Sequence, residues 1–200
     1  MDTQVAIGVA EPLKQVPSLV VITAVDESVC TATGDASEDI REAVAVLSSR
    51  QIPVVLSSHR PAAEVRALQA ALGVTEPFIC DGGGALHLPT GYFGALPGFG
   101  QRQEGWDVIA CATSRRDTDE SPEALRLLVS LYRMCAGEVI VVGVASHWRD
   151  RVLLREADVP IVVRCDADEQ RLARRFPAAY LTEQYGTAGW VEAMLGSAER

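Results

Sequence analysis

The sequence predicts an α/β fold, in which helices cover both faces of a doubly wound, mainly parallel sheet. Short apolar runs of strand length recur along the chain, and segments with helical apolar spacing separate them. Some of these runs are apolar at nearly every position, as strands buried on both faces of a parallel sheet require. Because 48% of the 200 residues are hydrophobic, the chain can bury the core of one such domain.

The first half of the chain supplies three expected strands with two helices between them. The expected strands are residues 19–25, 52–56 and 78–80. Ser37 can cap the first helix, whose apolar residues have the spacing i, i+3, i+4, i+7. These apolar residues are Ile40, Ala43, Val44 and Leu47. Gly73 can end the second helix, whose apolar face consists of Val65, Leu68 and Leu72.

The second half begins with a glycine-rich stretch, residues 82–105, which is typical of a hairpin and loop with a turn at residues 89–91. Ser121 and Pro122 then begin a helix as its N-cap and first residue, and Gly137 ends it. The apolar stripe of this helix is Ala124, Leu127, Leu128, Leu131 and Cys135. The remaining expected elements are strands at 106–111, 139–144 and 161–164 and helices at 149–156 and 190–195.

Charge and cysteine content restrict the partners and the compartment. A formal net charge of -9 repels phosphate, so no nucleic-acid or anionic-membrane partner is expected. No apolar run approaches the roughly 20 residues of a membrane span, and the first residues lack the basic region of a secretory signal. The five cysteines are scattered without a C-x-x-C pair, which indicates reduced packing thiols and a cytoplasmic protein.

Ligands of doubly wound sheets bind in a crevice beyond the carboxyl ends of the strands. In this chain the residues that follow the ends of the expected strands are 24–28, 57–60, 81–84 and 145–150. The sequence therefore predicts that a binding or catalytic site, if one exists, is built from these segments.

Three of the segments resemble the motifs of haloacid dehalogenase-like (HAD) phosphatases. Residues 22–28 (ITAVDES) are similar to the first motif of that superfamily, F-T-D-L-D-G-T. Residues 52–60 (IPVVLSSHR) are similar to the second motif, a strand that ends in Ser or Thr. Either Ser57 or Ser58 can be that hydroxyl, and similarity in the following helix favours Ser58. Residues 142–150 (VGVASHWRD) align without a gap to the fourth motif, i-G-L-G-D-S-P-N-D.

Further stretches resemble the mannosyl-3-phosphoglycerate phosphatases of this superfamily. Residues 77–84 (PFICDGGG) and 89–93 (PTGYF) are similar to P-F-I-x-E-N-G followed by P-x-G-Y-F. Residues 186–190 (GTAGW) resemble the closing G-P-x-G-W. The matches keep their order over residues 19–195, so the resemblance implies an HAD-like Rossmannoid core over almost the whole chain.

The resemblance implies covalent phosphatase chemistry for the family. An aspartate attacks phosphorus, and a second aspartate two residues later acts as general acid and base. Mg²⁺ held by carboxylates neutralises the phosphoryl oxygens, which a Ser or Thr and a Lys also contact. The residues that match these positions are Asp26 (acid/base), Ser28 and Ser58 (phosphate) and Asp150 (metal). Arg60 and Gly83 are further candidates for ligand binding.

The chain departs from the family pattern at the residues that carry the chemistry. Ala24 occupies the nucleophile position and offers no lone pair, which forbids the covalent route. Ser146 replaces a metal-binding carboxylate, so Mg²⁺ binding at Asp150 is expected to be weak and no cofactor is expected. Glu120 stands where the family has its lysine, and Lys14, the only lysine, lies before the first strand.

The segment that holds the cap domain in the family is short in this chain. We expect one domain over residues 1–200, in which residues 91–118 form only a loop or hairpin in place of the cap. Substrate specificity in the family resides in the cap, so the resemblance leaves the substrate of this chain open.

Some local patterns allow two interpretations. Residues 81–84 can cradle a phosphate with backbone N–H groups or form a tight bend into a hairpin, and the bend is favoured. Ser146, His147 and Asp150 resemble a Ser/His/Asp set, but residues on one turn seldom reach the geometry of a triad. Trp106 and Trp190 are expected to have packing roles. His59 and His87 are not expected to form a metal site.

These departures lead to one favoured function and two alternatives. The favoured hypothesis is a phosphatase-like protein without catalysis that has a binding or regulatory role, with a small phosphorylated metabolite as candidate ligand. The first alternative is an active phosphatase or other hydrolase that acts on a phosphorylated sugar or glycerate with the altered site. The second is a subunit whose face, left open by the missing cap, binds a protein partner.

Overall fold

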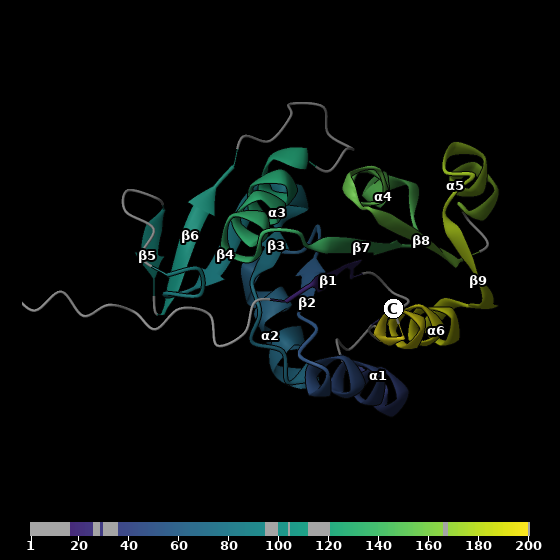
Figure 1. Ribbon diagram of the computed structural model, residues 1–200, viewed down its shortest axis with the longest axis horizontal. Coiled ribbons are helices and arrows are strands. Elements are labelled where there is room, and N and C mark those ends of the chain that lie inside the picture. The colour runs from purple at the N-terminus through teal and green to yellow at the C-terminus, as the bar shows by residue number, and fades with distance from the viewer. Residues whose placement is uncertain are drawn as a thin grey trace, which may run out of the picture.

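The computed structural model describes residues 17–25, 29, 36–94, 100–103, 105–111, 121–165 and 168–199 (Figure 1). The strands are β1 (Leu19–Ala24), β2 (Val54–Ser57), β3 (Phe78–Cys80), β4 (Ala85–Pro89), β5 (Gln101–Gln103), β6 (Trp106–Ala110), β7 (Ile140–Ala145), β8 (Val159–Arg164) and β9 (Tyr180–Tyr185). Within the described residues they form one sheet in the order β5-β6-β4-β3-β2-β1-β7-β8-β9.

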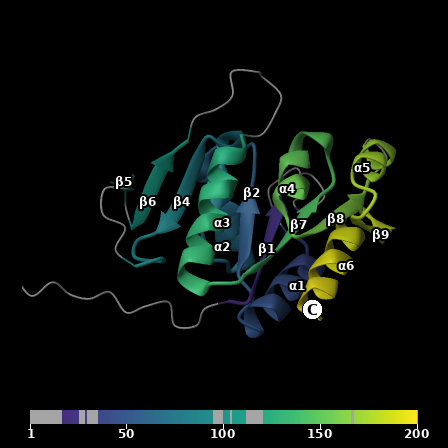
Figure 2. The ribbon, with the colours of Figure 1, turned by 45° about the horizontal axis from the view of Figure 1, so that its top comes forward.

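The sheet is mainly parallel. Neighbouring strands from β3 to β9 in this order are parallel, whereas β4, β6 and β5 are added to β3 in successive antiparallel pairs. Figure 2 shows β2, β1 and β7 pointing the same way and β4 running against them. The predicted α/β fold with a mainly parallel sheet is confirmed.

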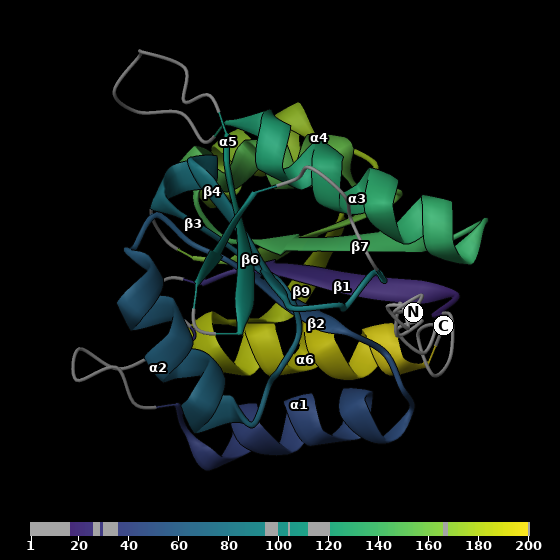
Figure 3. The same ribbon diagram turned by 90° about the vertical axis from the view of Figure 1, so that its left-hand side faces the viewer.

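Helices cover both faces of the sheet. They are α1 (Glu38–Ser49), α2 (Ala62–Leu72), α3 (Pro122–Ala136), α4 (Arg151–Glu156), α5 (Glu169–Arg175) and α6 (Gly186–Ala198), with 3-10 turns at Asp81–Gly83 and Trp148–Asp150. Figure 3 shows α1, α2 and α6 on one face and α3, α4 and α5 on the other. None of the helices in the described part of the chain has both the length and the apolar character of a membrane span.

Each face has its own hydrophobic core because β1 is buried on both sides. Val21 belongs to the core that α1, α2 and α6 complete, and Ile22 belongs to the core beneath α3 and α4. This alternation follows from the period of two along a strand. The continuous apolar run that predicts β1 in the sequence is therefore explained by two layers of helices.

The helices begin and end at the predicted residues where capping is involved. The Ser37 hydroxyl accepts a hydrogen bond from the Ile40 amide at 3.4 Å at the start of α1. Gly73 follows α2 with a φ of 68°, a left-handed conformation that glycine adopts without steric cost. Pro122 begins α3, and Gly137 follows its last residue.

Some elements differ from the expectation. The sequence patterns miss β5, α5 and β9, because the two strands lie at the edges of the sheet with mostly exposed side chains and α5 buries only Leu172. The last helix is longer than expected and begins at Gly186. Cys135, expected on the buried stripe of α3, is exposed because that stripe runs instead through Val129 and Tyr132.

The close packing of α4 on β7 depends on Gly143. A Cβ atom at this position would lie 2.7 Å from the Cβ atom of Ala157 and 3.0 Å from the carbonyl oxygen of Leu153. Any larger side chain would push α4 away from the sheet. This contact holds the start of α4, and Asp150 just before it, against the end of β7.

A buried hydrogen bond joins the central strand to the C-terminal helix. The indole N–H of Trp190 donates to Oγ1 of Thr23 at 2.8 Å, and both side chains are almost completely buried. A buried N–H group without an acceptor is costly, so this bond fixes α6 in one position on β1.

We expect Thr23→Val to lower the free energy of unfolding by about 1–3 kcal/mol, because it leaves the indole N–H of Trp190 without an acceptor. Thr23→Ser keeps the hydroxyl and should recover much of the loss. Thr90→Val changes an exposed turn residue and should have little effect. Denaturant unfolding measures all three, and equal losses for Thr23→Val and Thr90→Val would contradict the role of the bond.

Candidate functional site

The carboxyl ends of β1, β2, β3 and β7 lie together at one end of the strands. We call this end of the sheet the carboxyl edge (residues 24–25, 57–60, 81–84 and 145–150). Parallel pairing places Ala24 beside Ser57. Backbone hydrogen bonds continue the alignment past the strands, from the Val25 amide to the Ser57 carbonyl at 2.8 Å and from the Ser58 amide to the Ile79 carbonyl at 3.0 Å. These bonds hold the residues that follow β1, β2 and β3 side by side.

Ala24, at the nucleophile position of the family motif, ends β1 and is 4% exposed. Its side chain belongs to the apolar cluster beneath α3 and α4. A methyl group has no lone pair with which to attack phosphorus. The residue that the sequence resemblance aligns with the catalytic aspartate is therefore a packed methyl group.

The hydroxyl of Ser58 takes part in the local fold. Its Oγ atom accepts a hydrogen bond from the Arg60 amide at 3.1 Å and donates one to the Val25 carbonyl at 3.5 Å. The first bond stabilises the turn that leads into α2, and the second ties the end of β2 to the end of β1. A phosphate group at Ser58 would have to compete with these two bonds.

Arg60 and Arg149 bring positive charge to the carboxyl edge. The Arg60 guanidinium lies 3.6 Å from the carboxylate of Glu64, one helical turn later in α2. Both side chains of this pair are partly exposed, so the pair is weak and Arg60 can exchange Glu64 for another anion. The Arg149 side chain is 47% exposed and lies beside Asp150.

Asp150 and His59 form a close side-chain contact that the sequence patterns do not reveal. The Oδ1 atom of Asp150, which is 4% exposed, lies 3.3 Å from Nε2 of His59. The two residues follow β7 and β2, the strands on either side of β1. Strand order brings them together, so their common location just after strand ends is the only signal of the pair in the sequence.

The second oxygen of Asp150 has no hydrogen-bond partner among the residues that the structure describes. Oδ2 is buried, and the Nε atom of Arg149 lies 3.7 Å away, beyond hydrogen-bond distance. Buried carboxylate oxygens normally accept a hydrogen bond. Oδ2 is therefore an acceptor whose hydrogen-bonding capacity is unused among the described residues.

Ser146 and His147 form a second pair that is separate from Asp150. The Ser146 hydroxyl lies 2.9 Å from Nδ1 of His147. A triad would require Asp150 at the other nitrogen of His147, but the Asp150 carboxylate is paired with His59 and Arg149. The edge thus contains a Ser–His pair and an Asp–His pair.

The glycine-rich residues 81–84 form the bend that leads from β3 into β4. The amides of Asp81, Gly82 and Gly84 donate to the carbonyls of Arg60, Ser58 and Asp81, respectively. Gly83 has a φ of 85°, and a Cβ atom there would collide with the backbone of Ser121. Because three of the four amides are used internally, the segment fits a hairpin bend better than a phosphate cradle.

His87 and Trp190 are buried, and the partly buried Trp106 packs against the same core as His87. The His87 ring stacks on Phe78 with a centroid distance of 4.5 Å, and Trp106 packs against Phe78 at 5.2 Å. Burial, with a further contribution from the Arg66 charge, lowers the pKa of His87 to about 4. His87 is therefore neutral at pH 7, and Trp106 and Trp190 pack as expected.

Some predicted positions lie outside the described residues. They are Asp26 (acid/base), Ser28 (phosphate) and Glu120 (the position of the family lysine). Within residues 91–118, the described parts include β5 and β6, which extend the sheet beyond β4. The roles of Asp26, Ser28 and Glu120, and the identity of 91–118 as the remnant of a cap, stay predictions.

The residues that the structure describes are poorly suited to bind the Mg²⁺ ion used by the family. Two carboxylate positions hold Ala24 and Ser146, and one oxygen of the remaining Asp150 already faces His59. Among the residues that the structure describes, no group of three or more His, Cys, Asp or Glu could hold a metal ion. Mg²⁺ relies on carboxylate oxygens in near-octahedral geometry, which this set does not supply.

Comparison with solved structures identifies the fold. A protein from Bacteroides thetaiotaomicron, described among phosphatases of the haloalkanoate (HAD) enzyme superfamily, has a TM-score of 0.59 at 13% identity, over 93% of this chain and 97% of that chain. A haloacid dehalogenase-like hydrolase from the same organism has a TM-score of 0.58 at 13% identity, over 88% of this chain and 98% of that chain. The cobalt-bound deoxy-D-mannose-octulosonate 8-phosphate phosphatase from Haemophilus influenzae has a TM-score of 0.53 at 13% identity, over 92% of this chain and 90% of that chain.

These similarities show that the chain has the HAD-like Rossmannoid fold, as the motifs predict. Structural similarity at 13% sequence identity supports an inference about the fold but not about an activity. No protein-family model matches the chain, and no curated protein is similar to it in sequence. The relation to mannosyl-3-phosphoglycerate phosphatases stays a prediction.

We expect millimolar Mg²⁺ to leave the melting temperature unchanged, because a ligand raises it only by binding the native state. Thermal unfolding with and without the ion measures this. A reproducible increase that Asp150→Ala abolishes would show that Asp150 still holds the metal.

Proposed function

We propose that the chain is a phosphatase-like member of the HAD superfamily, related to mannosyl-3-phosphoglycerate phosphatases. In this proposal it has lost catalysis and acts as a binding or regulatory protein for a small phosphorylated metabolite. The observation that carries the proposal is Ala24, buried at the end of β1. The first bond to phosphorus forms at this position in the family, so alanine there removes the reaction itself.

Positive charge at the carboxyl edge supports anion binding without a metal. Arg60 and Arg149 are partly exposed, and each guanidinium can hold two phosphate oxygens at once. His59, beside Asp150, adds positive charge when it is protonated. These groups compensate in part for the missing lysine of the family.

The unpartnered Oδ2 atom of Asp150 favours a ligand that also carries hydroxyl groups. A hydroxyl of a phosphorylated sugar or glycerate can donate to this oxygen and remove the cost of leaving it unpaired. The carboxylate repels phosphate, so the phosphate of such a ligand must lie nearer to the arginines. We therefore expect inorganic phosphate alone to bind with only millimolar affinity.

The hydrogen bond between Ser146 and His147 supports a second candidate, a hydrolase with Ser146 as nucleophile and His147 as base. Its weakness is the position of Asp150, which pairs with His59 rather than orienting the His147 ring. Activity measurements separate this candidate from the non-catalytic protein.

The protein with Mg²⁺ should release phosphate from sugar phosphates and phosphoglycerates no faster than an Asp26→Ala variant. Ala24→Asp alone should not restore activity, because a second metal carboxylate and the lysine are also missing. Phosphate release over time measures both. Turnover that Asp26→Ala abolishes would overturn the non-catalytic proposal, and turnover that only Ser146→Ala abolishes would establish the second candidate.

Inorganic phosphate, titrated to tens of millimolar, should shift the backbone amide signals of residues 24–25, 57–60 and 149–150 in NMR spectra. Arg149→Gln should weaken this binding by about threefold to tenfold, the effect of one charged hydrogen bond. Arg133→Gln, at the far end of α3 where Arg133 pairs with Asp158, should not change it. Shifts that are absent or spread over the chain would contradict phosphate binding and favour the protein-partner role.

A further inference from the structure

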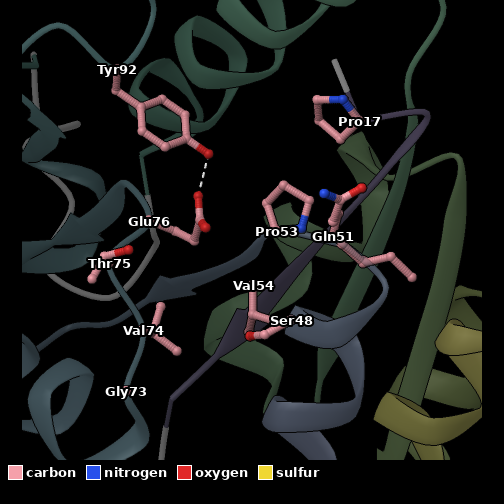
Figure 4. Close-up of a pocket in the computed structure, with 11 residues that line it drawn as sticks. Pro17, Ser48, Gln51, Pro53, Val54, Gly73, Val74, Thr75, Glu76 and Tyr92 are labelled. Carbon is pink, nitrogen blue, oxygen red and sulfur yellow. Dashed lines mark hydrogen bonds between the residues drawn. The ribbon is translucent and has the colours of Figure 1, made fainter. Parts of the chain in front are cut away.

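A pocket lies at the end of the sheet opposite to the carboxyl edge (Figure 4). It is bordered by residues that precede β1, β2 and β3, and its volume is about 380 Å³. This volume is typical of sites for small molecules. The six residues of β1 separate the pocket from the carboxyl edge, a distance of roughly 20 Å at the rise of an extended strand. We call it the amino-edge pocket.

The Glu76 carboxyl group in this pocket is held in place from behind. The Tyr92 hydroxyl donates to Oε2 of Glu76, and the Tyr132 hydroxyl lies 3.0 Å from that of Tyr92. The Gln69 side chain fixes the backbone by donating to the Glu76 carbonyl at 2.8 Å. Within the described part of the chain, Oε1 of Glu76 has no partner, so it is available to a ligand.

The remaining walls combine apolar surface with uncharged polar groups. Pro53, Val54 and Val74 supply the apolar surface, and Gln51 and Thr75 supply polar groups. No lysine, arginine or histidine is among the described residues that line the pocket. Among the described residues that line the pocket, Glu76 therefore has no countercharge, and burial raises its pKa.

Gln51 adds a second unusual feature at the wall of the pocket. Its φ is 59°, in the left-handed region that residues other than glycine seldom adopt. The turn is closed by the Gln51 amide, which donates to the Ser48 carbonyl at 2.9 Å. Figure 4 shows Gln51 and Pro53 on the side of the pocket away from Glu76 and Tyr92. Strained backbone of this kind gathers at ligand sites more often than elsewhere.

We propose that the amino-edge pocket binds a small primary amine, whose ammonium group donates to Oε1 of Glu76 while its short apolar body packs on Pro53, Val54 and Val74. An ammonium group supplies the missing countercharge and carries three donors, so it can also reach a polar wall group such as Gln51 or Thr75. An anionic ligand would meet the Glu76 carboxylate with nothing to offset the repulsion. The proposal does not depend on the function proposed for the carboxyl edge.

Three probes of the same size separate charge from shape: n-butylammonium, n-butanol and n-butyrate. Each is titrated by NMR while the amides of residues 51–54 and 74–76 are observed. The ammonium ion should bind about tenfold more tightly than the alcohol, as one charged hydrogen bond allows, and butyrate should bind least. Amides of residues 57–60 at the carboxyl edge should not move. Butyrate binding as well as the ammonium ion, or no localised shifts with any probe, would overturn the proposal.

Variants test the role of Glu76 directly. Glu76→Gln should remove the preference for the ammonium ion over the alcohol, whereas Glu138→Gln, on an exposed residue, should keep it. Thr75→Trp, at an exposed position of the lining, should block all three probes. This variant keeps Glu76, so it provides the test if Glu76→Gln is unstable. Unchanged ammonium binding in either pocket variant would contradict the proposal.

The pH dependence gives a further check. Of the described residues, the titratable groups that face the Glu76 carboxyl are Tyr92 and Tyr132, which stay protonated at neutral pH because burial raises the pKa of both. Since burial raises the pKa of Glu76 and the ammonium ion needs the carboxylate, affinity for n-butylammonium should rise with pH in the wild type, and the rise should extend above the usual range of a glutamate carboxyl group. The affinity should not change with pH in Glu76→Gln. A flat profile in the wild type would contradict the assigned contact.

Discussion

A carboxylate withdrawn from water needs positive charge or hydrogen-bond donors around it, and Asp150 sets this requirement at the carboxyl edge. His59 lies 3.3 Å from one oxygen, and Arg149 lies 3.7 Å from the other. In a phosphatase of this fold, several carboxylates lie together and a metal ion would supply the positive charge that balances them. With Ala24 and Ser146 in two of those positions, less negative charge remains, so an imidazole and a guanidinium can balance Asp150.

The fold creates this pairing through the order of its strands. β1 lies between β2 and β7, so the loops after β2 and β7 meet across its carboxyl end. Gly143 allows α4 to lie close to β7 and so holds Asp150 in position, and the Thr23–Trp190 hydrogen bond fixes the opposite face of β1. The same strands that place the pair at one edge separate it from Glu76 at the other. Within the described residues, the two ends of the sheet thus present different chemistry: an imidazole and a guanidinium lie beside a carboxylate at one end, and a carboxyl group without a countercharge lies at the other.

The sequence is sufficient for the fold class and for the central strands, because continuous apolar runs and capping residues such as Ser37 and Gly73 carry strong local signals. It does not reveal β5 or β9, whose exposed edge positions leave no periodic pattern. The proposed loss of the nucleophile rests on Ala24 alone, so the sequence is sufficient to suggest it. The pairing of His59 with Asp150 is not, because it joins residues from two loops whose proximity depends on the topology of the sheet.

The central claim is that His59 and Arg149, rather than a metal ion, lie against the carboxylate of Asp150. The most direct test is a crystal grown with Mn²⁺ and phosphate, in which anomalous scattering locates the metal. We predict no anomalous peak at Asp150, with His59 still paired to it. A peak within about 2 Å of an Asp150 oxygen, the distance of direct coordination, together with displacement of His59, would contradict the account.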